Sequence, residues 1–261
     1  MKAMIFAAGL GTRLKPLTDS MPKALVPVAG QPLIEHVARK LKAAGFGSAV
    51  VNVHHFADLL EDWTRRQEWM DFQISDERRL LLDTGGAVLH ARKLLEGSGK
   101  FLVHNVDILS DADLGDLFQA HDDSALATLL VSNRKTSRHF LFEAQSMRLV
   151  GWNNSATGET IMCDDSLSPS QCLELAYSGI MVLSDKVFTV MDGYVAAKGL
   201  SLNDGAGAVF GIRDFLLFAA SRNYGIYGRR CDELHMLDVG KCASLEEARQ
   251  KARFGGGFGN W

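Results

Sequence analysis

The sequence has few cysteines, and none of them has a spacing that binds metal. Four occur among 261 residues, and no two are separated by two residues as in the CxxC pattern of zinc sites. Scattered cysteines in a chain without a signal peptide are typical of free thiols in a reducing cytoplasm. We therefore expect unpaired thiols, and no structural zinc, at Cys163, Cys172, Cys231 and Cys242.

Long apolar runs and an excess of positive charge are also lacking. No apolar run reaches the ~18 residues of a membrane-spanning helix, and no signal peptide precedes the first strand-like segment. The formal net charge is −3, whereas nucleic-acid binders carry clustered positive charge. A content of 47% hydrophobic and 23% charged residues is ordinary for a globular protein. We expect a cytoplasmic protein with no nucleic-acid or membrane partner.

Strand-like and helix-like segments alternate over the first 132 residues. The short apolar run at 2–7 ends near a glycine, which indicates a buried strand. Residues 32–44 have apolar side chains at helical spacing, with Pro32 in the first turn and Gly45 after the end. Such alternation predicts parallel strands and an α/β layered fold. Further strands are expected at 49–53, 72–75, 101–105 and 126–132, and further helices at 57–70, 85–95 and 114–121.

After residue 133 the pattern changes to strands with few helices between them. We expect strands at 140–144, 149–152 and 176–183, built onto the edge of the first sheet, with a turn-rich loop at 153–159. A helix at 209–220 and strands at 225–228 and 236–240 follow. Ser244, with Glu247 three residues later, predicts a capping box for a last helix at 244–254. No linker divides the chain, so we expect one domain over 1–254 and a mobile glycine-rich tail at 255–261.

The stretch "IFAAGLGTRLKPLTDSMPKALVPVAG", at 5–30, has the properties of a phosphate-binding loop. It matches neither the GxxxxGK[ST] pattern of ATPases nor the GxGxxG pattern of dinucleotide sites, because Leu14 stands where the third glycine belongs. Gly9 and Gly11 allow backbone N–H groups to approach a polyphosphate closely. Thr12 adds a hydroxyl, and the guanidinium of Arg13 suits phosphate oxygens. Lys23 brings a second cation from the far end of the loop. The alternative is an ordinary turn with two surface cations.

The segment "AAGLGTRLKPLTDSMPKALVPVAGQPLIEH" resembles the signature of the sugar-phosphate nucleotidyltransferases. The resemblance continues in the family's order through "LLDTGGA", "VHNVDIL", "AYSGIMVLSDKVF", "FGIRDFLLFA" and "LDVG". Within the family the chain looks most like the short bacterial enzymes similar to N-acetylmuramate 1-phosphate uridylyltransferase, and like the mannose or heptose 1-phosphate transferases. These enzymes join a nucleoside triphosphate to a sugar 1-phosphate and release pyrophosphate.

The resemblance implies a Rossmann-like three-layer fold with a mixed, mostly parallel sheet. Residues 1–132 would form the nucleotide-binding half and 133–240 the sugar-binding half. The implied reaction is Mg²⁺-dependent, with UTP favoured as the nucleotide and with a monomer or small homo-oligomer as the assembly. Open alternatives are a GTP-dependent mannose or heptose 1-phosphate guanylyltransferase and a cytidylyltransferase that uses phosphocholine. A further alternative is a non-catalytic protein that binds sugar nucleotides.

The resemblance also assigns roles to residues at matching positions. Asp107 and Asp238 would bind Mg²⁺, a hard cation that prefers one or two carboxylates and several waters. Arg13 and Lys23 would be catalytic, acting through position and charge. The sugar would lie near Asn105, Ser178 and Gly179. The nucleotide would lie against Ala8, Gly9, Gly11, Thr12, Glu77, Thr84 and Gly85.

Several of these assignments leave alternatives. Glu77 is a ribose or base contact, or one solvated charge in "SDERR". For His54 and His55 we favour a packing role and one contact at the rim of the site over a role in catalysis. Val106 replaces the glycine usual in the family, and Lys241 adds a charge beside Asp238, either as a phosphate contact or as a solvated lysine.

Overall fold

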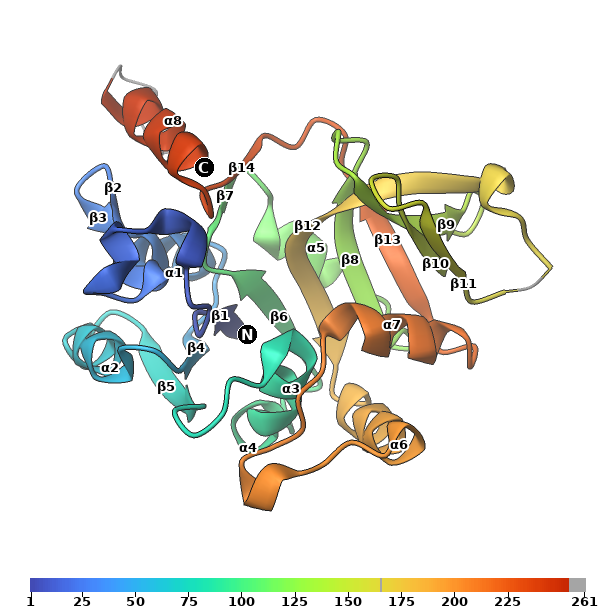
Figure 1. Ribbon diagram of the computed structural model, residues 1–261, viewed down its shortest axis with the longest axis horizontal. Helices are drawn as coiled ribbons and strands as arrows, with labels where there is room; N and C mark the ends of the chain where they lie inside the picture. The colour runs from blue at the N-terminus through green and yellow to red at the C-terminus, as the bar shows by residue number, and fades with distance from the viewer. Residues whose placement is uncertain (165, 254–261) are drawn as a thin grey trace.

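The computed structural model of the protein describes residues 1–164 and 166–253 (Figure 1). The tail predicted at 255–261 lies outside the described residues. None of the described helices is long and apolar enough to cross a membrane. All four cysteines are free, as expected.

Four parallel strands form the part of the sheet that the first half of the sequence predicts. They are β1 (Lys2–Phe6), β4 (Ser48–Val53), β5 (Asp71–Asp76) and β6 (Lys100–Asn105). Their spatial order is β6-β1-β4-β5, with Phe6 opposite Asn105 and Ile5 opposite Val51. Because the strands are parallel, their carboxyl ends meet at one edge of the sheet, where ligands bind in open α/β folds.

Six further strands extend this sheet beyond β6, as expected. The long strand β12 (Cys172–Ser184) pairs antiparallel with β6 on one side. On its other side it pairs first with β9 (Arg138–Glu143) and then with β8 (Ala127–Ser132). Strand β13 (Ile226–Arg230) adds to β8, while β10 (Leu149–Asn154) and β11 (Glu159–Met162) add to β9. Strand β8 therefore lies with the second half in space although its residues precede 133.

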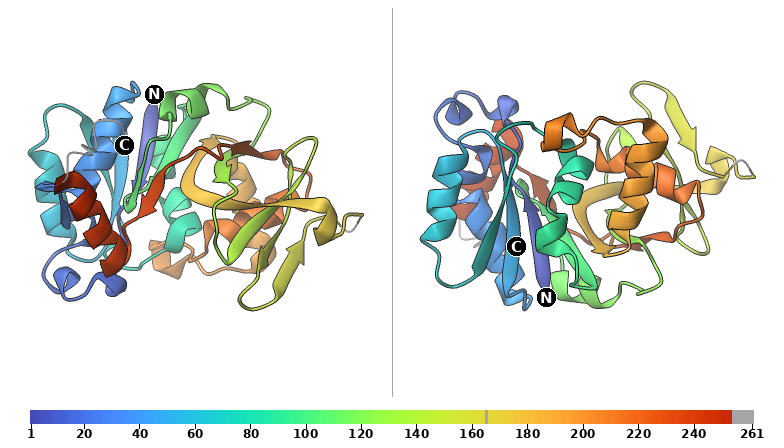
Figure 2. Two further views of the ribbon diagram at one scale, coloured as in Figure 1. Left: turned by 90° about the horizontal axis from the view of Figure 1, so that it is seen from above. Right: turned by 90° about the horizontal axis from the view of Figure 1, so that it is seen from below.

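Helices cover both faces of the sheet and give three layers (Figure 2). Alternate strand residues face opposite ways, so Ala3 and Ile5 belong to one apolar cluster and Met4 to the other. The first cluster includes side chains of α1 (Leu33–Ala43), α2 (Ala57–Arg65), α5 (Leu114–Gln119) and α8 (Cys242–Arg253). The second includes side chains of α3 (Asp83–His90), α4 (Arg92–Leu95), α6 (Val187–Lys198) and α7 (Ile212–Ala220). The predicted three-layer α/β fold is confirmed.

Short elements complete the chain. Two small antiparallel pairs stand apart from the main sheet: β2 (Pro27–Val28) with β3 (Gln31–Pro32), and β7 (Ile108–Ser110) with β14 (Met236–Asp238). Single 3₁₀ turns occur at Thr12–Leu14, Leu17–Asp19, Lys23–Leu25, Pro169–Gln171 and Asn203–Gly205.

The structure corrects four local expectations. Helix α6 lies in a region where few helices were expected. Its sequence has no clear polar stripe to mark a helix, and most of its apolar side chains are buried. The helix predicted at 85–95 is interrupted at Ala91. The turn expected at 153–159 is shorter, because β10 and β11 extend into it. The capping box at Ser244 is wrong: α8 begins at Cys242, and the Ser244 hydroxyl donates to the Lys241 carbonyl at 3.3 Å.

The glycine at the start of α3 tests how closely α3 packs against the segment before α7. A Cβ atom at Gly86 would lie 2.1 Å from the Ala208 carbonyl oxygen, whereas one at Gly193 in α6 would meet no atom within 4 Å. We expect Gly86→Ala to lower the free energy of unfolding by about 1–3 kcal/mol. Gly193→Ala, the matched control, should raise it by roughly 0.5–1 kcal/mol. Urea denaturation of both variants measures the difference, and equal stabilities would contradict the packing.

Candidate active site

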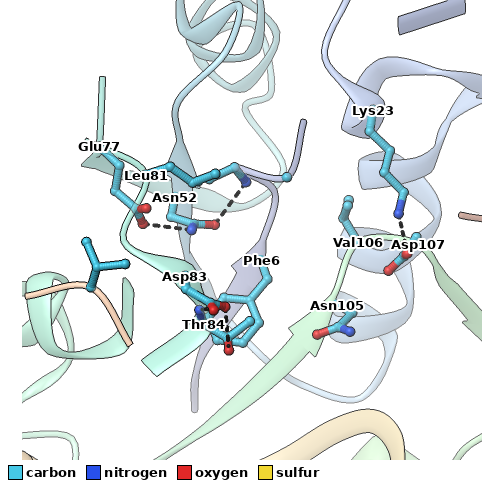
Figure 3. Close-up of a pocket in the computed structure, with 13 residues that line it drawn as sticks. Phe6, Lys23, Asn52, Glu77, Leu81, Asp83, Thr84, Asn105, Val106 and Asp107 are labelled. Atoms are coloured by element: carbon cyan, nitrogen blue, oxygen red, sulfur yellow. Dashed lines mark hydrogen bonds and ion pairs between the residues drawn. The ribbon is translucent and has the colours of Figure 1, made fainter. Parts of the chain in front are cut away.

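A cavity of about 400 Å³ opens at the carboxyl ends of β1, β4 and β6 (Figure 3). Glycine-loop residues, a buried acid and the residues after β6 contribute to its wall. Figure 3 shows Lys23 and Asp107 on one side of it and Asn52 and Glu77 on the other. The lining residues are Phe6, Ala8, Gly9, Lys23, Asn52, Glu77, Leu81, Asp83, Thr84, Asn105, Val106, Asp107 and Val209.

The loop after β1 folds back on itself and returns Lys23 to the cavity. Gly11 has φ +64°, a left-handed conformation that favours glycine. A side chain there would also meet Thr18 Cγ2 at 2.8 Å and Lys23 Cβ at 3.0 Å. The Thr18 hydroxyl donates to the Gly11 carbonyl at 2.9 Å and closes the loop. Gly11 is therefore needed for the loop's shape, and neither it nor the exposed Thr12 lines the cavity.

Lys23 and Asp107 form an ion pair at the wall of the cavity. The Lys23 ammonium contacts Asp107 Oδ2, and the two side chains are only 11% and 14% exposed. Water screens the attraction less at this burial than on an open surface. The pair joins the end of the glycine loop to the end of β6.

Asp238 and Arg13 approach the same point from other parts of the chain. Strand β14 pairs with β7, which places Asp238 opposite Ile108, next to Asp107. A methyl group on Gly240 would lie 2.8 Å from Asp238 Oδ1, 2.9 Å from Asp107 Oδ2 and 2.9 Å from Arg13 Nη2. Two carboxylates and a guanidinium thus meet around one glycine that has no side chain to separate them.

The two aspartates fit the ligand set of Mg²⁺. This ion takes one or two protein carboxylates and completes its shell with waters and phosphate oxygens. Among residues 1–164 and 166–253, no group of three or more His, Cys, Asp or Glu side chains forms an all-protein cage.

Glu77 is a buried acid, which excludes the alternative of a solvated charge. Its side chain lines the cavity, and the residue is 2% exposed. Oε1 accepts a hydrogen bond from Asn52 Nδ2 at 2.7 Å, and Oε2 accepts one from the Leu82 N–H at 3.2 Å. Burial raises the pKa of the Glu77 carboxyl, while these two hydrogen bonds oppose that shift.

The start of α3 contributes Thr84 to the cavity but not Gly85. The Thr84 hydroxyl lies between two partners: it accepts from the Ile212 N–H at 2.9 Å and donates to Asp83 Oδ1 at 3.1 Å. Gly85 is not among the lining residues, and a Cβ atom there would lie 2.4 Å from the Phe210 ring. Its N–H donates to the Phe210 carbonyl at 2.9 Å, so the structure gives this glycine a packing role.

The three residues assigned to the sugar lie together but in different environments. Asn105 lines the cavity, and Gly179 packs against it: a Cβ atom at Gly179 would lie 2.9 Å from Asn105 Nδ2. Gly179 has φ +83°, which no larger residue adopts without strain. The buried Ser178 hydroxyl donates to the Leu130 carbonyl at 2.8 Å. Asn105 therefore lies at the cavity wall, while the other two residues shape the strand beside it.

Asn52 and Asp83 are lining residues that the sequence analysis does not assign. Asn52 lies in the otherwise apolar strand "SAVVNV". A single amide in such a strand was the feature of the sequence that could have indicated a functional residue. Val106 lines the cavity in place of the family's glycine. His54 and His55 lie just after the end of β4. A ring nitrogen of His54 contacts the Glu77 carbonyl oxygen at 2.7 Å, which agrees with a packing role. Lys241 is exposed.

The model of the family described as nucleotidyl transferase matches residues 2–140, which is more than half of the chain. The chain belongs to this family. The N-acetylmuramate alpha-1-phosphate uridylyltransferase of Caulobacter vibrioides is 52% identical over 109 residues, 40% of this chain and 45% of that protein. Mannose-1-phosphate guanylyltransferase 1 of Arabidopsis thaliana is 37% identical over 126 residues, 46% of this chain and 35% of that protein.

Solved structures agree on the fold over nearly the whole chain. The UDP-glucose pyrophosphorylase from Acinetobacter baumannii gives a TM-score of 0.75 at 19% identity, covering 99% of this chain and 95% of that one. At that identity the likeness shows the fold alone. The matched part is less than half of the length of either curated relative above. The family resemblance stated from the sequence is confirmed.

His104, next to Asn105, makes the stability of this strand depend on pH. The residue is 1% exposed, and burial lowers the pKa of its imidazole from 6.5 to about 4. Between these values the unfolded chain binds the extra proton and the folded chain does not, so stability falls as the pH falls. The difference corresponds to about 3 kcal/mol. Between pH 7 and pH 4 the parent should lose this free energy of unfolding in addition to the losses from other groups. His104→Leu should not show this extra loss, and urea denaturation of both proteins at the two pH values measures the difference. Parallel curves would contradict this.

Proposed function

We propose that the protein transfers a nucleotidyl group from a nucleoside triphosphate, with UTP favoured, to a sugar 1-phosphate. The observation that carries the proposal is the convergence of Arg13, Lys23, Asp107 and Asp238 beside a cavity lined by the glycine loop. Such a cluster offers cations for phosphate oxygens and carboxylates for a metal, next to a space for a base and a sugar.

In the proposed reaction an oxygen of the sugar phosphate attacks the α-phosphorus of the nucleotide in line. A new bond forms between that oxygen and the α-phosphorus, and the bond from the α-phosphorus to the bridging oxygen breaks. Pyrophosphate leaves with the electron pair. The nucleophile is already an anion, so no general base is required, and positioning and charge neutralisation supply the catalysis.

The residues of the cluster divide this work. Arg13 holds the leaving pyrophosphate, and Lys23 contacts the reacting phosphates. Asp107 and Asp238 would hold Mg²⁺, which supplies charge neutralisation and orientation of the phosphates when it is bound. Glu77, Ala8 and Gly9 face the base, and Asn105 faces the sugar.

Two relatives bear on the choice of nucleotide. The 52% identity to a protein named as a uridylyltransferase supports UTP, and the lower identity to a guanylyltransferase keeps GTP and mannose 1-phosphate as the second candidate. A phosphocholine acceptor is less well supported. Trp152 in β10, an aromatic side chain that could hold a quaternary ammonium, is 4% exposed, and the Arg213 guanidinium lies over its ring, 4.4 Å from the ring centre.

A grid of pyrophosphate-release assays with Mg²⁺ tests the function. UTP, GTP, CTP and dTTP are crossed with N-acetylmuramic acid, N-acetylglucosamine, mannose, glucose and heptose 1-phosphates, and with phosphocholine. We expect one strong combination, with UTP. Nucleotide binding without any turnover would favour the non-catalytic alternative, and no binding at all would contradict the proposal.

Removal of the Lys23 ammonium tests its contact with the reacting phosphates. We expect Lys23→Ala to lower kcat by about 10²- to 10³-fold, while the Kd for the nucleotide rises less than tenfold. Lys15→Ala is the matched control, since Lys15 lies in the same loop, is exposed and pairs with Asp19. Unchanged turnover in the Lys23 variant would remove this residue from the mechanism.

Asp238→Asn tests the metal assignment. The variant keeps the side-chain shape but loses the charge that would attract a divalent cation. We expect a normal melting temperature and a Mg²⁺ requirement shifted at least about tenfold higher. Asp232→Asn, on the surface beside Arg230, is the control. A normal Mg²⁺ titration of the Asp238 variant would refute the assignment.

A further inference from the structure

Asn52 connects three segments that line the cavity. It lies in β4 and is 4% exposed. Its Oδ1 accepts hydrogen bonds from the Ala7 N–H at 2.7 Å and the Ala8 N–H at 3.3 Å, at the start of the glycine loop. Its Nδ2 donates to Glu77 Oε1, and Glu77 Oε2 accepts from the Leu82 N–H before α3. One amide therefore sets the distance between the glycine loop and the buried acid.

The hydrogen-bond donors fix the orientation of both side chains. Two backbone N–H groups require an oxygen at Oδ1 of Asn52, so its nitrogen must point toward Glu77. Glu77 in turn receives a donor on each of its oxygens. Glu77 also lines the cavity. Its remaining oxygen lone pairs can therefore accept hydrogen bonds from a ligand. An amide at position 77 would turn one of its N–H groups against a donor.

We propose that Asn52 is a positioning residue for base recognition, which holds Glu77 as a hydrogen-bond acceptor beside the Ala7–Ala8 main chain. The inference rests on the proposed function, because it gives the nucleotide base a place against Glu77. A base with an N–H donor on its pairing edge, as in uracil at N3 or guanine at N1, complements this acceptor. Where the ring nitrogen is the atom opposite Glu77, cytosine at N3 and adenine at N1 present an acceptor and leave the carboxylate unpaired, so these bases are disfavoured in that position.

An exchange of the two side-chain types tests the network without relying on a disruptive change. Asn52→Asp places two carboxylates against each other, and Glu77→Gln places two donors against each other. In the double variant Asn52→Asp with Glu77→Gln, the new carboxylate accepts from the Ala7 and Ala8 N–H groups and from the amide N–H of the introduced glutamine. The oxygen of that glutamine accepts from the Leu82 N–H. Every hydrogen bond and the net charge are restored.

We expect each single variant to lower the melting temperature by about 4–8 °C or more and the double variant to recover most of the loss. Thermal melts without ligand measure this. A double variant less stable than either single variant would overturn the network. Asn154→Leu is the matched control, because Asn154 is also a buried asparagine and its Oδ1 accepts from the Ala156 N–H in the distant β10–β11 turn.

Nucleotide selectivity tests the role in recognition. Titration calorimetry and steady-state kinetics with UTP, GTP, CTP and ATP, each with Mg²⁺, give Kd, KM and kcat. We expect Asn52→Asp to raise Kd and KM for the preferred nucleotide about tenfold, with kcat within about twofold, since the reacting phosphates lie elsewhere. In the stable double variant the preference for the parent's nucleotide over CTP should fall about tenfold, because the introduced glutamine offers both the donor and the acceptor that cytosine needs.

Two outcomes would overturn the inference and are distinct from failure of the function. A double variant with parental selectivity would show that the base does not contact Glu77, and equal losses of affinity in Asn154→Leu would show that instability alone is the cause. A parent protein that binds none of the four nucleotides would instead contradict the proposed function, and this inference with it.

Discussion

The attraction between the Lys23 ammonium and the Asp107 carboxylate is the interaction around which the site is arranged. One partner ends a long glycine loop and the other follows a central strand, so the pair closes that loop against the sheet. Gly11 permits the loop to turn, Thr18 secures the turn, and Gly240 leaves room for Arg13 and Asp238 to approach the same point. Charges of both signs thus gather in a small volume without an intervening side chain.

The sheet explains why these residues meet. Parallel strands bring their carboxyl ends to one edge, where the glycine loop after β1 lies between Asp107, which follows β6, and Asn52 in β4. The two-stranded pair β7–β14 then adds Asp238, which is 131 residues farther along the chain and not part of the main sheet. The apolar layers on both faces hold the strands in place.

Much of this could be predicted from sequence, and the rest depends on long-range packing. Strands such as β1 and helices such as α1 have clear apolar periods, and the loop at 5–30 has a recognisable motif. Asn52 was missed because its partners are Ala7 and Ala8 at the start of the glycine loop and Glu77 after β5, which no local pattern connects. Gly85 could not be assigned to packing without knowledge that Phe210 lies against it. The Ser244 cap failed because α8 starts two residues earlier.

Strand β12 has a mechanical consequence. Its thirteen residues bond to β6 on one side and to β8 and β9 on the other, so the two halves of the molecule share one continuous strand. Within 172–184 no flexible linker exists that could serve as a hinge. The strand's regular pairing is interrupted between Tyr177 and Met181, where Gly179 packs against Asn105. Bending between the halves would therefore concentrate at this irregularity. Because Gly179 packs against Asn105, such a bend would also move the wall of the cavity.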